Sequence, residues 1–545
     1  MAGRPLLLSA TALLLATTTH ARCQDTPRQP NFLVIVADDL GFSDLGAFGG
    51  EIATPNLDRL AMSGLRLTGF HTAAACAPTR AMLLTGSDAH RVGLGNMPES
   101  TQKNQVGQPG YEGYLRPDTA TLAERLSAAN YRTLFSGKWH LGVEENQSPQ
   151  ARGFAHSFAL LNCCHNHFGL GLSADPQKMS GYRENGKMVT QLPADFYSSR
   201  FFASKLVEQL QESRAGPDGA NPFFATLAFS APHAPIQAPS ETIARYRGQY
   251  DAGYAALRLQ RLEKQRALGL LDPAVEPHRM VDAPAWDALS SDEQHLAARR
   301  MEIYAAMVEE LDTAVGRVVD ELKASGEIDN TVIFFLSDNG AEGRFVPTGV
   351  AEGPPEAMGS ATGYIQYGPG WAQAATAPSW RWKTFASEGG TRSAAFVSGP
   401  GVSREGAVSA HYTSVADIVP TALDLAGIAI EPGQFAGRKV QPIDGLSWKP
   451  LLTAGAAVYP GDRPVGAELF GSRSLRKGDW KIVDIGDQRW RLFNLRRDPG
   501  EVRDLSETEP GKKAEMLRDW DLYAKDVNVV LPDPPLQPTP IIDTE

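Results

Sequence analysis

Five short apolar segments constrain the fold of this 545-residue chain more than any other feature of its sequence. Each segment is rich in Val, Ile, Leu or Phe and ends in polar or charged residues. Continuous apolar runs of this length are typical of strands that are buried on both faces of a mostly parallel sheet. The five expected strands lie within residues 31–39, 131–140, 222–233, 331–340 and 393–401.

Helical patterns lie between these strands. The first follows a Thr-Pro pair and ends at Gly64, which is a favourable start and stop for a helix. The expected helices are residues 54–64, 119–131 (opening on Thr119), 291–324 and 413–428. Alternating strands and helices predict an α/β fold in which helices sandwich a large mixed, mostly parallel sheet.

The pattern changes after about residue 455. The stretches RSLRKGDWKIVDI and RWRLFNLRRDPGEVRDLS are alternating or turn-bounded, and a helical pattern follows around residues 513–526. This is typical of a small antiparallel sheet with a helix. We therefore expect a large α/β domain over residues 25–454 and a C-terminal α+β subdomain over residues 455–545.

The N-terminus has the layout of a secretory signal peptide. Arg4 precedes an apolar run over residues 6–16, and small residues follow up to Ala21. The run is too short to cross a membrane. We assign residues 1–24 to the signal peptide and expect an exported protein, periplasmic or secreted. The net charge of −11 argues against nucleic-acid binding, which needs a basic surface.

The chain has few cysteines for an exported protein. They are Cys23, Cys76, Cys163 and Cys164. The last two are adjacent, with His165 and His167 beyond them, but adjacent ligands cannot easily spread around one zinc tetrahedron. We expect a loop with a vicinal or shared disulfide there. Cys76 is left without an obvious partner.

Polar side chains follow four of the expected strands. They are Asp38, Asp39, Lys138, His140, His233, Asp338 and Asn339. Ligand sites of open α/β sheets lie beyond the carboxyl ends of the strands, so these residues should converge on one edge. Carboxylates and an amide oxygen suit a hard divalent cation such as Ca²⁺ or Mg²⁺.

Lys138 and His140 are two residues apart and should project to the same side of an extended segment. A lysine and a histidine so placed suit an anionic oxyacid and a proton transfer. Prolines on both sides of His233 favour its rigid presentation. Residues 341–392 form a long, aromatic-rich segment that we expect to be a packed lid or pocket wall. Lys383, within it, has the pattern of an ordinary exposed lysine when taken alone.

Cys76 stands at an expected helix N-terminus and near Arg80, which predicts a lowered thiol pKa and real nucleophilicity. A cysteine hydrolase would use such a thiol. That interpretation leaves Lys138, Arg80 and the expected metal without a role. The combined set favours an anionic, tetrahedral substrate at a divalent cation.

Two motifs give the chain a family resemblance. Cys76-Ala77-Pro78-Thr79-Arg80, followed by AMLLTG, resembles the sulfatase signature, whose cysteine is oxidised enzymatically to Cα-formylglycine. YRTLFSGKWH resembles the second sulfatase signature, with Asn130 where a glycine is usual. The likeness runs from about residue 30 to at least residue 500 and is closest in style to bacterial arylsulfatases. The chain is identified as a member of the type I sulfatases, with an alkaline-phosphatase-like fold.

The resemblance implies a cofactor and a set of site residues. A formylglycine-generating enzyme would convert Cys76 to formylglycine (3-oxoalanine), and one Ca²⁺, or Mg²⁺, would be bound. The implied metal ligands are Asp38, Asp39, Asp338, Asn339 and the modified Cys76. The implied catalytic residues are Cys76, Arg80, Lys138, His140, His233, Asp338 and Lys383.

The resemblance also implies a role for each of these residues. A diol oxygen at position 76 attacks sulfur, Arg80 and Lys138 stabilise the diol, and Asp338 helps to accept its proton. His233 and Lys383 bind the sulfate and assist the leaving group. His140 then takes a proton from the remaining hydroxyl, and sulfate departs.

Three functions stay open at this point. The first is hydrolysis of small-molecule sulfate monoesters, with aryl sulfates favoured. The second is phosphate or phosphonate monoester hydrolysis on the same fold, and the third is a non-catalytic binding homologue. Trp371, Trp380 and Trp382 suggest an apolar leaving group but would also suit sugars.

Overall fold

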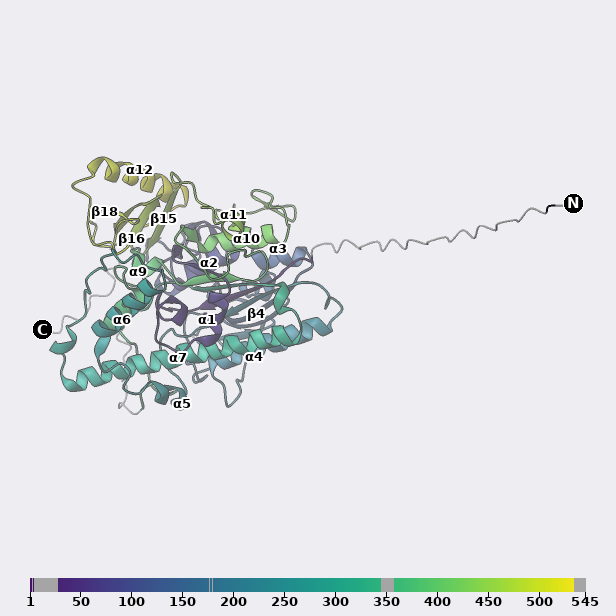
Figure 1. Cartoon of the computed structure of the whole chain (residues 1–545), viewed down its shortest axis with the longest axis horizontal. Helices are drawn as coiled ribbons and strands as arrows, with labels where there is room; N and C mark the ends of the chain where they lie inside the picture. Colours follow the sequence, from purple (N-terminus) through teal and green to yellow (C-terminus); the bar gives the residue numbers. More distant parts are fainter. Residues whose placement is uncertain (2, 4–27, 176, 179, 345–356, 534–545) are drawn as a thin grey trace.

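A ten-stranded sheet lies at the centre of the computed structural model, with helices on both of its faces (Figure 1). The strand order is β11-β2-β10-β9-β1-β8-β4-β5-β6-β7. The neighbours β9, β1, β8 and β4 run parallel, which confirms the mostly parallel sheet. These four strands match the first four expected ones, and their bounds are β1 Asn31–Ala37, β4 Arg132–Lys138, β8 Phe223–Ala228 and β9 Thr331–Ser337.

The fifth expected strand is β10 (Ala395–Ser398), which pairs antiparallel with β9. It makes the sheet mixed, as predicted. The remaining strands extend the two edges of the sheet. They are β2 Leu65–Leu67, β5 His156–Leu160, β6 Tyr182–Glu184, β7 Lys187–Met188 and β11 Ala407–Ser409.

The structure describes residues 28–344 and 357–533, apart from 176 and 179, together with residues 1 and 3. Of the expected signal peptide, only residues 1 and 3 belong to this described part. Cys23 lies outside it. Within the described part, no helix combines the length and apolar character that crossing a bilayer needs.

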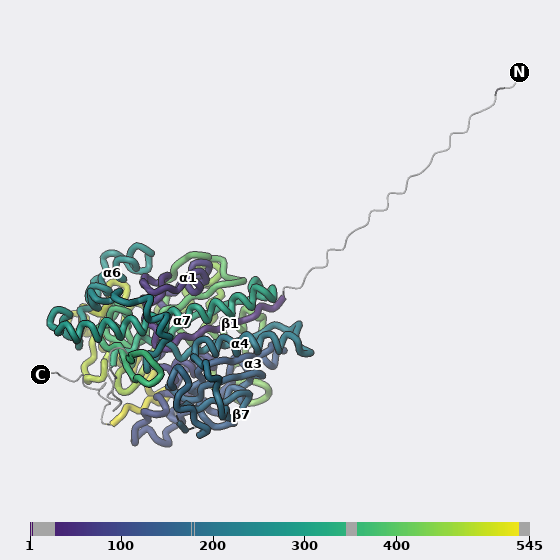
Figure 2. Tube along the Cα trace, turned by 90° about the horizontal axis from the view of Figure 1, so that it is seen from below, coloured from purple at the N-terminus to yellow at the C-terminus, as the bar shows by residue number. Residues whose placement is uncertain are grey.

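Helices cover both faces of the sheet. One face carries α1 (Pro55–Met62), α4 (Ser198–Ala215) and α7 (Ser291–Ala324), and Figure 2 shows α4 and α7 side by side. The other face carries α2 (Cys76–Thr85), α3 (Leu122–Ala128) and α10 (Ile418–Leu425).

The longest of these helices, α7, has the predicted bounds. Ser290 caps it, and its hydroxyl accepts from the Glu293 N–H in a capping box. Its expected stripe is fully buried and consists of Ile303, Met307, Leu311 and Val315. Burial of each such side chain contributes about 2 kcal/mol relative to exposure, so this stripe fixes α7 against the sheet.

Two helices begin later than predicted. The cap of α3 is Thr121, which pairs with Glu124 in a capping box, whereas the Thr119 hydroxyl donates to the Arg116 carbonyl. The expected helix at 413–428 is shortened because Thr413 and Ser414 form a strand paired with Phe70–His71. The first helix start is therefore shifted by a local hydrogen bond, and the second by pairing with a distant strand.

The C-terminal region contains the expected small antiparallel sheet, which has four strands, and α12 packs on it (Figure 1). Its own core is built around Leu475, Ile482 and Trp520. The elements are β15 Pro464–Leu469, β16 Ser472–Lys477, β17 Trp480–Asp484, β18 Arg491–Asn494 and α12 Pro510–Asp526.

The described part of the aromatic segment is packed, as predicted, and forms α8 (Pro369–Thr376) and α9 (Glu388–Thr391). Trp371 is 1% exposed and packs edge-on against three rings of the core, and Trp380 and Trp382 are also buried. These tryptophans are therefore core residues and not an open platform. Their burial therefore removes the basis for inferring an apolar leaving group from them.

Candidate active site

The carboxyl ends of the four parallel strands bring the predicted site residues together. Asp38 and Asp39 follow β1, Asp338 and Asn339 follow β9, and Lys138 is the last residue of β4. The strands are hydrogen-bonded neighbours, so their ends meet at one sheet edge. Convergence at this edge is confirmed.

An acidic cluster forms the centre of the site. One ligand atom from each of Asp38, Asp39, Cys76 and Asp338 lies within 4.8 Å of the others, and all four residues are buried. Among the described residues, Asp38 Oδ1 and Asn339 Oδ1 accept no hydrogen bond. A buried oxygen without a partner costs about 1–3 kcal/mol. A hard cation would satisfy both oxygens, so the residues present fit a divalent metal ion.

The electrostatics of the cluster also favour a cation. Burial and the nearby charge of Asp38 raise the pKa of Asp338 to about 6. For Asp39, burial is outweighed by Lys383, His233 and Lys138, which hold its pKa below the usual range. Added positive charge at the cluster would therefore relieve the repulsion around Asp338.

Three basic side chains surround the acids. Arg80 Nη2 donates to Asp338 Oδ2 at 2.7 Å, and Lys138 Nζ donates to Asp38 Oδ2 at 2.7 Å. Lys383 Nζ lies 2.7 Å from Asp39 Oδ1. Lys383 is 2% exposed, so the expectation of an ordinary exposed lysine was wrong. The site thus holds alternating buried charges, an arrangement that suits an anionic substrate.

Cys76 is the first residue of α2 and is fully buried. Its Sγ lies 4.0 Å from Asp39 Oδ1. Burial, and next the charge of Asp38, raise the pKa of the thiol well above its usual value. The predicted lowering of this pKa was wrong, because desolvation and the carboxylates outweigh the helix N-terminus and Lys138. A thiol in this state is a poor nucleophile.

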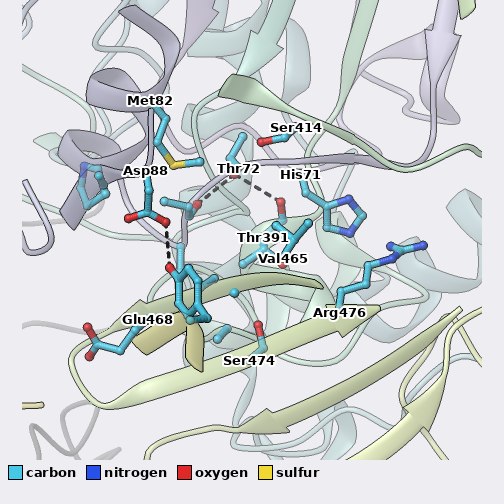
Figure 3. Close-up of a pocket in the computed structure, with 18 of the residues that line it drawn as sticks. His71, Thr72, Met82, Asp88, Thr391, Ser414, Val465, Glu468, Ser474 and Arg476 are labelled. Atoms are coloured by element: carbon cyan, nitrogen blue, oxygen red, sulfur yellow. Dashed lines mark hydrogen bonds between the residues drawn. The ribbon is translucent and has the colours of Figure 1, made fainter. Parts of the chain in front are cut away.

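The opposite face of α2 borders a separate cavity of about 70 Å³ (Figure 3). Helical spacing places Cys76 and Arg80 on one face and Pro78 and Met82 on the other. The cavity lies between α2 and the C-terminal sheet, and its lining includes Pro78, Met82, Thr391, Val465, Ser474 and Arg476. Cys76 and Arg80 do not line it, so it is distinct from the acidic cluster.

The two predicted histidines approach the cluster from different loops. His233 Nε2 lies 3.6 Å from Asp39 Oδ2, and burial lowers the pKa of His233 to about 3. His140 is 3% exposed and has a left-handed backbone with φ of 58°. Its Nε2 lies 3.2 Å from Glu99 Oε2. Sequence reasoning missed Glu99, which lies in the 3₁₀ turn Pro98–Ser100 and carries no motif.

Cys163 and Cys164 are free thiols, so the predicted disulfide is wrong. His165 and His167 support the loop that carries His233, and hydroxyl or carbonyl groups engage all four of their ring nitrogens. His165 Nε2 lies 2.5 Å from Ser230 Oγ, and His167 Nε2 lies 3.0 Å from the His233 carbonyl oxygen. The two closely spaced histidines of CCHNHFG could have predicted this supporting role from the sequence.

Carboxylates and the Arg and Lys side chains paired with them meet at the carboxyl edge of a mixed α/β sheet. This fold and this site together define an enzyme that acts on anionic esters. The chain belongs to the sulfatase family, whose model matches residues 30–428. It is 42% identical over 537 residues to an uncharacterized sulfatase of Schizosaccharomyces pombe, covering 93% of this chain and 95% of that one. It is 38% identical over 466 residues to an arylsulfatase of Klebsiella aerogenes, covering 82% of this chain and 97% of that protein.

The fold comparison agrees. A crystal structure of Ps i-CgsB in complex with k-i-k-neocarrahexaose matches with a TM-score of 0.67 and 25% identity, over 91% of this chain and 93% of that one. The alkaline-phosphatase-like fold and the identification from the two motifs are confirmed. The protein is a sulfuric ester hydrolase.

Proposed function

We propose that this sulfatase hydrolyses aryl sulfate monoesters, using Cα-formylglycine formed from Cys76 and one Ca²⁺ or Mg²⁺ held at the acidic cluster. One observation carries the proposal. A buried thiol with a raised pKa stands within a cluster in which Asp38 Oδ1 and Asn339 Oδ1 accept no hydrogen bond from the described residues.

The state of Cys76 supports its oxidation. A thiol with a raised pKa would contribute little as a nucleophile at neutral pH, yet the residue occupies the centre of the site. Hydrated formylglycine supplies one hydroxyl for attack on sulfur and a second that can lose a proton. A formylglycine-generating enzyme is the maturation partner that this proposal requires.

The metal ligands in the proposal are Asp38, Asp39, Asp338, Asn339 and position 76. A bound divalent cation would neutralise the repelling carboxylates and polarise a sulfate oxygen. With the carboxylates engaged by metal, the ammonium groups of Lys138 and Lys383 would be shared with the substrate. Both lysines are charged, because Asp38 and Asp39 raise their pKa values against the effect of burial.

The remaining groups orient the ester and move protons. Arg80 donates to Asp338 and to the Lys138 carbonyl, which holds its guanidinium beside position 76. We assign anion binding and assistance to the leaving oxygen to Lys383 and His233. Asp338 accepts the first proton. His140 takes the second.

The aryl specificity rests on similarity. The relative from Klebsiella aerogenes is named an arylsulfatase, and this chain spans nearly all of it. Ps i-CgsB was solved in complex with k-i-k-neocarrahexaose, so a sugar sulfate is the competing substrate. Export by the 1–24 signal peptide, and the division at residue 454 into a catalytic domain and a C-terminal subdomain, also remain proposals.

Mass spectrometry of the peptide that contains position 76, from protein exported by its native host, tests the maturation. The expected result is an aldehyde or its hydrate at position 76. In parallel, release of p-nitrophenol from its sulfate and phosphate esters tests the reaction. An unmodified thiol together with no hydrolysis of the sulfate ester would overturn the proposal. Faster hydrolysis of the phosphate ester would favour the phosphatase alternative.

A further inference from the structure

The two ring nitrogens of His140 have different surroundings. Nε2 lies 3.2 Å from Glu99 Oε2, whereas the buried Nδ1 has no hydrogen-bond partner within the described part of the chain. The backbone N–H of His140 donates to the Leu161 carbonyl at 3.1 Å, which holds the left-handed residue in place. A strained, buried histidine with one unused nitrogen is typical of a functional position.

The contact with Glu99 decides where the imidazole proton lies. A carboxylate only accepts hydrogen bonds, so Nε2 must carry the proton and donate it. The neutral ring then has its lone pair on Nδ1. Burial lowers the pKa of His140, so the ring is neutral at physiological pH. Although burial opposes its ionisation, Glu99 remains a carboxylate, because His140 lowers its pKa to about 2.

We propose that Glu99 is a positioning residue of this sulfatase, which fixes His140 in the Nε2–H tautomer and thereby makes Nδ1 the proton acceptor. The inference rests on the proposed function of His140. The proton passes from a hydroxyl oxygen at position 76 to Nδ1, and the O–H bonding pair stays on that oxygen. Glu99 acts only through His140 and touches no reacting atom.

A simple surface ion pair is the competing explanation for this contact. The Glu99 side chain is 40% exposed, and exposed pairs contribute between 0 and about 1 kcal/mol. A surface pair would leave the tautomer and the turnover of the enzyme unaffected. The buried state of the histidine and its unused Nδ1 favour the positioning role.

The first test reads the tautomer directly and needs neither the metal nor mature formylglycine. Long-range ¹H–¹⁵N NMR of the full chain, labelled in histidine, reports which nitrogen is protonated, and His140→Asn identifies the signal. We expect the Nε2–H form in the wild type and in Glu99→Gln, which keeps an acceptor. In Glu99→Ala we expect a mixture or the Nδ1–H form. An unchanged Nε2–H form in Glu99→Ala would overturn the proposal.

The second test follows turnover of p-nitrophenyl sulfate by the matured enzyme. Glu99→Ala should lower kcat about 10²-fold and lower KM with it, so that kcat/KM changes little, and Glu99→Gln should restore part of the loss. A burst of about one equivalent of phenol should precede the slow phase, since only the later proton transfer is impaired. Wild-type kcat in Glu99→Ala, or loss of the burst, would contradict the proposal.

Glu145→Ala is the matched control, because Glu145 is an exposed glutamate in another 3₁₀ turn, Glu145–Gln147. It should behave as the wild type in both tests, and thermal unfolding checks that all variants fold. Failure of the wild type itself to release p-nitrophenol would overturn the proposed function instead. The NMR result would still decide what Glu99 does to His140.

Discussion

Two buried histidines of this protein differ in the number of carboxylates that contact the imidazole ring. His90 and His140 each have a side chain that is 3% exposed and in contact with a carboxylate. His90 Nδ1 lies 3.1 Å from Asp88 Oδ1 and its Nε2 lies 3.3 Å from Glu468 Oε2, whereas His140 has Glu99 alone. With both nitrogens on acids, the pKa of His90 rises to about 9 despite burial. His140 stays neutral.

The difference separates a structural site from a catalytic one. At neutral pH His90 is a cation that joins β15 to the segment after α2, and Asp88 also accepts from Tyr523 of α12. All of these polar atoms are used within the fold. At the sheet edge, one side-chain atom each of Asp38, Asn339 and His140 has no hydrogen-bond partner in the described structure. These atoms can therefore contact a metal ion or a substrate, whereas those of the His90 network are already engaged.

The largest expected effect is at position 76. Cys76→Ala and Asp338→Asn should each lower turnover by on the order of 10⁴-fold or more, because both act at the reacting atoms. Circular dichroism should show an intact fold. His90→Gln is the contrasting variant, with reduced stability and nearly native kcat. Native turnover in Cys76→Ala would show that the nucleophile is misassigned.

Removal of the divalent cation comes next. Chelation should abolish hydrolysis and lower the melting temperature, and Ca²⁺ or Mg²⁺ should restore both. A cation at a hundred times its Kd stabilises the folded state by about 2.7 kcal/mol. Asp38→Asn should weaken this thermal shift, whereas His90→Gln should retain it. A melting temperature that changes with neither chelator nor added cation would argue against the acidic cluster as a metal site.

The pH dependence of stability should distinguish the two histidines. The folded pKa of His90, about 9, lies above its unfolded value near 6.5, so its contribution is complete below pH 6.5 and is lost as pH rises through 9. The loss is on the order of 3 kcal/mol. Urea unfolding at pH 6 and pH 9.5 should show it in the wild type but not in His90→Gln. His140→Asn should retain the wild-type dependence.

The smallest effect is expected at the edge of the His90 network. Tyr523→Phe removes the hydrogen bond from the tyrosine hydroxyl to Asp88 Oδ2, which is 2.8 Å long. The free energy of unfolding should fall by about 1 kcal/mol, and kcat should not change. A large loss of turnover would mean that the C-terminal subdomain is coupled to the active site.

Much of the site could be predicted from the sequence because its residues follow buried strands. Asp38, Lys138 and Asp338 stand at the ends of parallel neighbours, and the topology of such sheets brings these ends together. Asn130 was also correctly predicted to tolerate unusual backbone angles, with φ of 64°. Lys138 ends β4 and His140 has a left-handed backbone, so the extended segment assumed in the argument from their two-residue spacing does not reach His140.

The failures share a cause. The thiol pKa of Cys76, the exposure of Lys383 and the role of Trp371 all depend on what surrounds the side chain, and burial by distant segments cannot be deduced from local spacing. Glu99 was missed because a turn far from His140 in the chain supplies it. The capping of α3 at Thr121 is an exception with a local cause, because the Thr119 hydroxyl donates to the Arg116 carbonyl three residues before it.

The sequence by itself determined the α/β alternation, the acids and bases at the strand ends and the sulfatase motifs, because these are carried by short stretches whose periodicity or spacing has a local meaning. Only the tertiary structure decided which buried charges are satisfied. Hydrogen-bond partners such as Glu99 and Glu468 come from distant parts of the chain, and each partner decides whether a histidine is a cation or a base.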